Sequence, residues 1–151
     1  MLAPGNRAPD FTAANQNDER ISLAELLKSG PLILYFYSAD FTPGCTREAC
    51  ALRDLHAQLA AAGIGVAGVS PQTPDSHAAF AAKHALPFTL LCDPDKSLAR
   101  AYDVVGPLGF GIRRASFLIS QAGVIEDAVL ADLRIARHEA FFRKAAATRA
   151  R

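Results

Sequence analysis

A chain of 151 residues, 50% of them apolar, is long enough to form one domain with a hydrophobic core over residues 1–151. Its formal net charge of +1 excludes a strong general attraction to nucleic acid or acidic membranes, and no apolar run is long enough to cross a bilayer. Without a signal-peptide-like start and with only three cysteines, the sequence predicts a cytoplasmic protein whose cysteines serve redox chemistry, not a disulfide framework.

The first part of the chain predicts a short hairpin followed by a short helix. Strands are expected over residues 9–12 and 20–22, on either side of a polar turn. Ser22 and Glu25 have the spacing of a capping box, which predicts a helix that runs to about Lys28.

The central part alternates strands and helices. The apolar run 32–37 shows no alternation, which predicts a central strand covered on both faces. Thr42 as N-cap and Pro43 at the first helical position predict a long helix over residues 42–62. The next expected elements are a strand over 65–70, a helix over 73–84, a strand over 88–91, and a short helix capped by Asp93 or Asp95 that runs to Tyr102.

The last part predicts two strands and a helix. After a loop at 105–111 rich in glycine and proline, strands are expected over residues 115–119 and 124–131 and a helix over 135–147. Strands that alternate with helices and end in a hairpin and a final helix predict an α/β sandwich, with a central mixed β-sheet flanked by helices.

Residues 42–50 read Thr-Pro-Gly-Cys-Thr-Arg-Glu-Ala-Cys and carry two of the three cysteines. Cys45 falls in the first turn of the predicted helix, where free backbone N–H groups and the positive end of the helix dipole favour the thiolate. Cys50, five residues on, can intercept the oxidised form of Cys45. This pattern indicates a thiol peroxidase built around Cys45.

The spacing of Cys45 and Cys50 limits how they can pair. On one regular helix their Cα atoms would lie roughly 8–9 Å apart, whereas a disulfide requires less than about 7 Å. A bond between them therefore requires part of the helix to unwind, which predicts a cycle between a helical dithiol and an unwound disulfide. Cysteines of the thioredoxin type lie three positions apart, whereas Cys45 and Cys50 lie five apart. The histidines are scattered along the chain, so they do not complete the four ligands of a zinc site.

Residues 35–37 and 41–50 together resemble the active-site segment of peroxiredoxins, and the match is to the bacterioferritin-comigratory, or peroxiredoxin Q, group. The similarity extends over essentially the whole chain and includes residues 8–11, 88–93 and 114–119. It implies a thioredoxin-like fold of the peroxiredoxin type.

The resemblance also implies roles for individual residues. Cys45 matches the peroxidatic cysteine, whose thiolate becomes a sulfenic acid, and Cys50 matches the resolving cysteine that condenses with it to a disulfide. Thr42 matches the threonine that hydrogen-bonds thiolate and peroxide, and Arg114 matches the arginine that stabilises thiolate and developing oxyanion. The implied partners are hydrogen peroxide, organic hydroperoxides and thioredoxin or a similar dithiol reductant, with no metal or organic cofactor and a monomeric protein.

The chain departs from the family at Ser38, where the family usually has a proline that shields the reactive sulfur. The resemblance therefore does not extend to peroxide selectivity or resistance to over-oxidation. Another branch of the group carries its resolving cysteine in the helix after the second strand, and the helix expected over residues 73–84 contains none, which favours Cys50. Cys92 is interpreted as an inert core thiol.

Three questions stay open at the level of the sequence. Arg113 and Arg114 are adjacent, so on a strand only one can reach the thiolate, and the family-like order Arg-Ala-Ser-Phe favours Arg114. Glu48 either holds an arginine in place or is a solvated helix residue. A non-enzymatic redox sensor or chaperone switched by oxidation of Cys45 and Cys50 is the alternative function, and a thiol–disulfide oxidoreductase is a weaker one.

Overall fold

A five-stranded sheet with strand order β5-β4-β3-β6-β7 forms the centre of the computed structural model, which describes residues 1–149. β3, β4 and β5 pair in parallel, while β6 pairs antiparallel to β3 and β7 antiparallel to β6, so the predicted mixed sheet is confirmed. A separate antiparallel ribbon, β1-β2, lies near the N-terminus. The strands are β1 Thr12–Ala14, β2 Arg20–Ser22, β3 Leu32–Phe36, β4 Gly65–Ser70, β5 Thr89–Cys92, β6 Ala115–Ile119 and β7 Ile125–Leu130.

The central strand β3 is buried along its whole length. Its side chains alternate between two hydrophobic clusters, with Leu32, Leu34 and Phe36 in one and Ile33 and Tyr35 in the other. Both faces are therefore covered, as the unbroken apolar run predicts.

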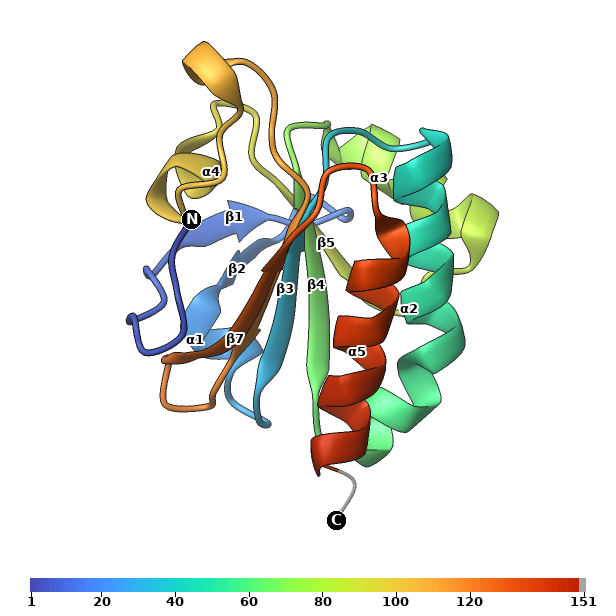
Figure 1. Ribbon diagram of the computed structural model, residues 1–151. Coiled ribbons are helices and arrows are strands. Elements are labelled where there is room, and N and C mark those ends of the chain that lie inside the picture. The colour runs from blue at the N-terminus through green and yellow to red at the C-terminus, as the bar shows by residue number, and fades with distance from the viewer. Residues whose placement is uncertain (150–151) are drawn as a thin grey trace.

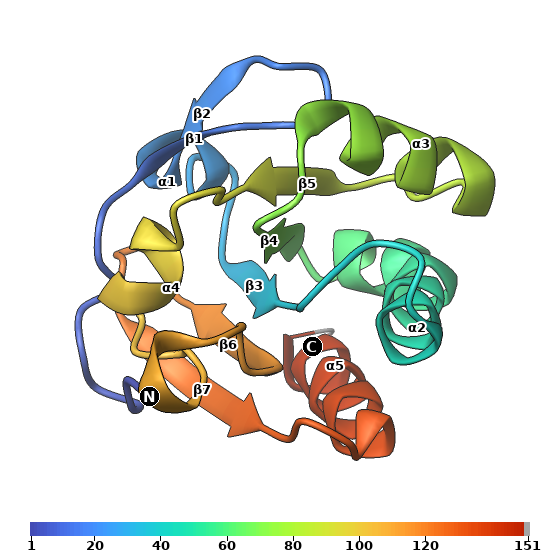
Figure 2. The same ribbon diagram turned by 90° about the horizontal axis from the view of Figure 1, so that it is seen from above.

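Helices cover the two faces of the sheet (Figures 1 and 2). The long helices α2, Pro43–Ala61, and α5, Ile135–Arg149, pack side by side on one face, together with α3, Pro74–His84. The short helices α1, Leu23–Leu26, and α4, Ser97–Ala101, lie on the opposite face with the β1-β2 ribbon. This layering confirms the expected α/β architecture.

The sheet places three segments together at one edge. β3 leaves the sheet at this edge and leads into α2, while β6 and α5 begin there (Figure 1). The first turn of α2 therefore lies beside residues that are far away in the sequence.

Most predicted boundaries are confirmed within one or two residues, and those of β4, β6 and α3 agree closely. The first predicted strand is wrong: β1 covers Thr12–Ala14 because Thr12 pairs with Ser22, whereas the Pro9 carbonyl accepts a hydrogen bond from the Tyr102 hydroxyl. The Ser22–Glu25 capping box is present, but α1 ends at Leu26 instead of Lys28.

Two further helices differ from expectation in detail. Asp93 and Asp95 both accept hydrogen bonds from backbone N–H groups in the first turn of α4, although Lys96 occupies the N-cap position. The last helix, α5, continues to Arg149 instead of ending at residue 147. The loop over residues 105–111 contains one short 3₁₀ turn, Pro107–Gly109.

Candidate active site

Cys45 lies in the first turn of α2 with its side chain only 1% exposed. The Ser38 hydroxyl approaches its sulfur to 3.6 Å. Thr42 occupies the N-cap position as predicted, but its side chain makes no cap hydrogen bond to the helix. Its hydroxyl instead donates to the Ala39 carbonyl at 3.1 Å, so Thr42 shapes the loop around the thiol.

The pocket favours the thiolate form of Cys45. Burial alone would raise the pKa of this thiol, because a buried charge loses its hydration. Hydrogen bonds from the Ala39 backbone and the Thr42 hydroxyl lower it, and so do the positive charge of Arg114 and the Ser38 hydroxyl. The lowering contributions prevail, so the pKa of Cys45 falls below its ordinary value.

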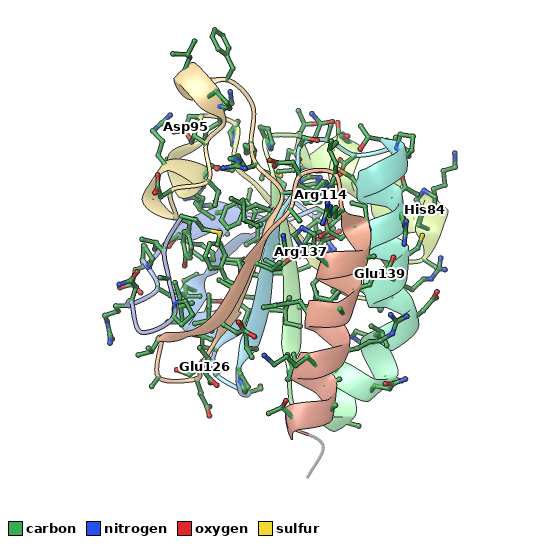
Figure 3. The ribbon with its side chains drawn as sticks, viewed as in Figure 1. His84, Asp95, Arg114, Glu126, Arg137 and Glu139 are labelled. Carbon is green, nitrogen blue, oxygen red and sulfur yellow. The ribbon has the colours of Figure 1, made fainter. Side chains whose placement is uncertain are left out.

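Arg114 reaches this pocket from the segment just before β6 (Figure 3). Its positive charge lies close enough to Cys45 to lower the pKa of the thiol, and the guanidinium donates from Nη1 to Glu48 Oε1 at 3.2 Å. A Cβ atom on Gly44 would lie 3.1 Å from Arg114 Nη2, so the glycine leaves room for the guanidinium. Arg113 is instead 42% exposed and donates from Nη2 to Asp132 at 2.8 Å. The structure thus brings Arg114, not Arg113, to the thiol.

Glu48 is a fully buried member of the same site. Its contact with Arg114 confirms the interpretation that it holds an arginine, and the solvated alternative is wrong. The second carboxylate oxygen, Oε2, lies 3.2 Å from His138 Nδ1 but has no hydrogen-bond partner among the described residues.

His138 is a site residue that sequence reasoning missed. Its Nε2 donates to the Ala131 carbonyl at 3.0 Å, and its Nδ1 lies 2.9 Å from the Ser116 hydroxyl. The side chain is completely buried on α5, on the same helix face as Ile135 and Phe142. A histidine in that apolar stripe was the available signal, because a buried imidazole needs partners for both nitrogens.

Cys50 lies one and a half turns further along α2 and is half-buried. Its sulfur lies 3.9 Å from His84 Nδ1, at the end of α3. α2 is continuous from Pro43 to Ala61 and all three cysteines are free, so the structure has the expected helical dithiol state. Cys92 is buried at the end of β5, and burial raises the pKa of its thiol to about 11, as suits a core residue.

A second buried network fixes the loop before α2. Asp40 accepts hydrogen bonds from the Tyr37 hydroxyl at 2.6 Å and from His77 Nδ1 at 2.8 Å, while His77 Nε2 donates to the Leu91 carbonyl. Both ring nitrogens of His77 thus lie within hydrogen-bond distance of oxygen atoms. Although burial alone would raise the pKa of Asp40, its bonds with His77 and Tyr37 lower it below the ordinary value. No local pattern in the sequence indicates this pair.

Neither a metal site nor a membrane-spanning helix occurs within residues 1–149. No three His, Cys, Asp or Glu side chains of this range gather to hold a metal ion. None of its helices combines the length and the apolar character needed to cross a bilayer.

The fold and the stabilised thiolate of Cys45 define a thiol-dependent redox enzyme. A model described as the AhpC/TSA family matches residues 4–128. Peroxiredoxin Bcp of Bacillus subtilis is 41% identical over 125 residues, which cover 79% of this chain and 79% of that protein. The chain therefore belongs to the AhpC/TSA family, among the peroxiredoxins of the Bcp and peroxiredoxin Q group. This membership supports a peroxidase over a non-enzymatic sensor.

Solved structures agree with the assignment. Peroxidoxin BcpB from Mycobacterium tuberculosis matches with a TM-score of 0.91 and 28% identity, over 98% of each chain. The bacterioferritin comigratory protein of Xanthomonas campestris matches with a TM-score of 0.85 and 29% identity, over 100% of this chain and 98% of that one. The expected thioredoxin-like fold of the peroxiredoxin type is confirmed.

Proposed function

We propose that this peroxidase reduces hydrogen peroxide and organic hydroperoxides with Cys45 as the peroxidatic thiol, Cys50 as the resolving thiol, and thioredoxin or a similar dithiol as the reductant. The observation that carries the proposal is the pocket at the start of α2, which surrounds the Cys45 sulfur with hydrogen-bond donors and one guanidinium and lowers its pKa. The Xanthomonas campestris relative is described by its alkyl peroxide reduction activity, which supports the organic substrates.

In the first step the Cys45 thiolate attacks the terminal oxygen of the peroxide. The O–O bond breaks, the sulfur becomes a sulfenic acid, and the leaving alkoxide or hydroxide takes up a proton as alcohol or water. Arg114 is placed to stabilise the negative charge as it passes from sulfur to oxygen. The Thr42 hydroxyl bonds the Ala39 carbonyl and contributes to lowering the pKa of Cys45, and its oxygen can also accept a hydrogen bond from the O–H of the peroxide.

In the second step the Cys50 thiol condenses with the Cys45 sulfenic acid, forming a disulfide and releasing water. Part of α2 has to unwind for this, because residues five apart on an intact helix are too distant. A dithiol reductant then restores both thiols by exchange. One chain in a reducing cytoplasm suffices for the cycle, since both thiols lie on one helix, and we propose a monomer there.

A peroxidase assay with thioredoxin and thioredoxin reductase tests this proposal on three proteins. Wild type should turn over, Cys45→Ser should consume no peroxide, and Cys50→Ser should form one equivalent of sulfenic acid and then stop. Turnover of Cys50→Ser at the wild-type rate would contradict the resolving role and direct attention to Cys92 or an external thiol. Insulin reduction by the wild type would instead support the thiol–disulfide oxidoreductase.

A further inference from the structure

Glu48 lies inside the segment that has to unwind. It stands between Cys45 and Cys50 on α2, and its side chain is completely buried. Residues on an unwinding helical segment change their neighbours, so the carboxyl group cannot keep its present surroundings when the two sulfurs bond.

Four titratable groups on different elements surround this carboxyl group. Arg114, just before β6, donates to its Oε1, and His138 on α5 faces its Oε2 at 3.2 Å. Cys45 on α2 and Tyr35 on β3 are close enough for their charges and that of Glu48 to influence one another. Arg114 is the one permanent cation among them, and it is shared with the Cys45 thiolate.

The hydrogen-bond geometry favours a proton on the Glu48 carboxyl. His138 Nε2 faces the Ala131 carbonyl, which can only accept, so this nitrogen carries the hydrogen of a neutral ring. Nδ1 then accepts from the Ser116 hydroxyl, and its lone pair lies 3.2 Å from Oε2. Two unprotonated acceptors this close repel each other, whereas a protonated Oε2 does not.

The electrostatics agree with this assignment. Burial raises the pKa of Glu48 to about 8; Arg114 opposes the rise and the Cys45 thiolate adds to it. Burial lowers the pKa of His138, so the ring is neutral at neutral pH.

We propose that the Glu48 carboxyl is the latch of the redox switch: Arg114 holds it beside His138 in the helical dithiol state, and formation of the Cys45–Cys50 disulfide moves it into solvent, where it releases its proton. The proposal rests on the proposed resolving role of Cys50. The coupled step is Cys45–SOH plus Cys50–SH giving the disulfide and water, while Glu48–COOH becomes Glu48–COO⁻ and a proton passes to solvent. Sulfur supplies and accepts all the electrons, and Glu48 contributes only the proton.

The latch makes the switch depend on pH. A solvated glutamate has a pKa of about 4.3, so the helical state, with its value of about 8, binds more protons than the unwound state between these limits. The helix is therefore favoured most at acidic pH, and rising pH shifts the balance toward the unwound disulfide by up to about tenfold per pH unit until about pH 8.

The test is the equilibrium between the reduced protein and its disulfide in a dithiothreitol redox buffer, measured from pH 5 to pH 8 by thiol trapping and mass spectrometry. Wild type should take up one proton more per disulfide reduced than Glu48→Gln. The glutamine side chain still offers an oxygen to Arg114, but it cannot ionise. Asp54→Asn, an exposed carboxyl on α2, should behave like wild type. Equal proton uptake by wild type and Glu48→Gln would overturn the latch.

A second measurement does not depend on the variant's folding. In wild type with ¹³C-labelled glutamate carboxyls, the Glu48 resonance at pH 7 should be that of a protonated acid in the dithiol state and of a carboxylate in the disulfide state. A carboxylate in both states would overturn the proposal. If peroxide produces no Cys45–Cys50 disulfide in wild type, the proposed function itself fails, and this outcome is distinct from a disulfide that forms without the extra proton.

Discussion

Arg114 Nη1 and Glu48 Oε1 meet at 3.2 Å although 66 residues separate them in the chain. The charge of the same guanidinium lowers the pKa of Cys45, so one cation acts on both a buried carboxyl and the reactive thiol. The contact joins the start of β6 to the first turns of α2, the two segments that the sheet brings to one edge. Because Glu48 and Cys45 both lie on α2, Arg114 can act on the thiol in this way only while the start of α2 is helical.

Replacing Arg114 with glutamine should raise the pKa of Cys45 and slow peroxide reduction. The positive charge that lowers the pKa would be lost, together with a preorganised donor for the developing oxyanion. We expect the second-order rate constant at neutral pH to fall by about 10²- to 10³-fold. Thiolate absorbance at 240 nm against pH measures the first effect, and peroxide consumption under single-turnover conditions measures the second.

Arg113→Gln is the matched control for this prediction. Arg113 is next in sequence but points to Asp132 at the surface, so its loss should change the rate less than about threefold. Similar losses of rate in Arg113→Gln and Arg114→Gln would mean that only the total positive charge of residues 113–114 matters, and not the position of Arg114 beside Cys45.

Ser38→Ala should also raise the pKa of Cys45, but by less. The hydroxyl is one of several groups that lower this pKa, and it lies 3.6 Å from the sulfur. We expect a slower reaction at neutral pH by up to about tenfold, since a hydrogen bond to a charged group contributes about 1.5 kcal/mol or less at such a distance. The same titration and single-turnover assay apply. An unchanged pKa of Cys45 in Ser38→Ala would show that the Ser38 hydroxyl does not stabilise the thiolate.

The elements of this fold could be predicted because their signals are local. The apolar run of β3, and Thr42 with Pro43 at the start of α2, each specify an element without information from elsewhere in the chain. The same local pattern predicted the placement of Cys45 in a first helical turn.

The partners of these elements could not be predicted in the same way. Whether Glu48 faces solvent or an arginine depends on how α2 packs against the sheet and α5, and His138 enters the site only through that packing. Periodicity left Arg113 and Arg114 equivalent, and family resemblance favoured Arg114. The Asp40–His77 pair joins the loop before α2 to helix α3, and neither residue lies in a pattern that signals the other.

Cys92 should react slowly with alkylating reagents and play no part in turnover. Burial raises the pKa of its thiol to about 11, so at pH 7 only about one molecule in 10⁴ carries the thiolate. Brief iodoacetamide treatment followed by peptide mass spectrometry should label Cys45 well before Cys92, and Cys92→Ser should keep the wild-type rate with thioredoxin. Loss of turnover in Cys92→Ser would assign it a part in the cycle.

Asp40→Asn should destabilise the protein most strongly at neutral pH. The substitution removes the carboxylate from a fully buried contact with the His77 ring, and removing one partner of such a buried pair costs roughly 3–5 kcal/mol. At about 2–4 °C per kcal/mol for a chain of this size, Tm should fall by at least about 6 °C. Because the fold lowers the pKa of Asp40, its stabilisation is complete above the ordinary value of about 3.9 and is lost as pH falls through the folded value.

The difference in unfolding free energy between wild type and Asp40→Asn should therefore be constant near pH 7 and shrink below about pH 4, measured by urea denaturation at each pH. Asp103→Asn is the matched control, because Asp103 pairs with the N-terminal amine at the surface and its loss should cost less than about 1 kcal/mol. Equal stability losses in the two variants would contradict the prediction, since they would place the Asp40–His77 pair among surface ion pairs. A loss confined to Asp40→Asn, accompanied by slower peroxide reduction, would tie the rigidity of the loop before α2 to the reactivity of Cys45.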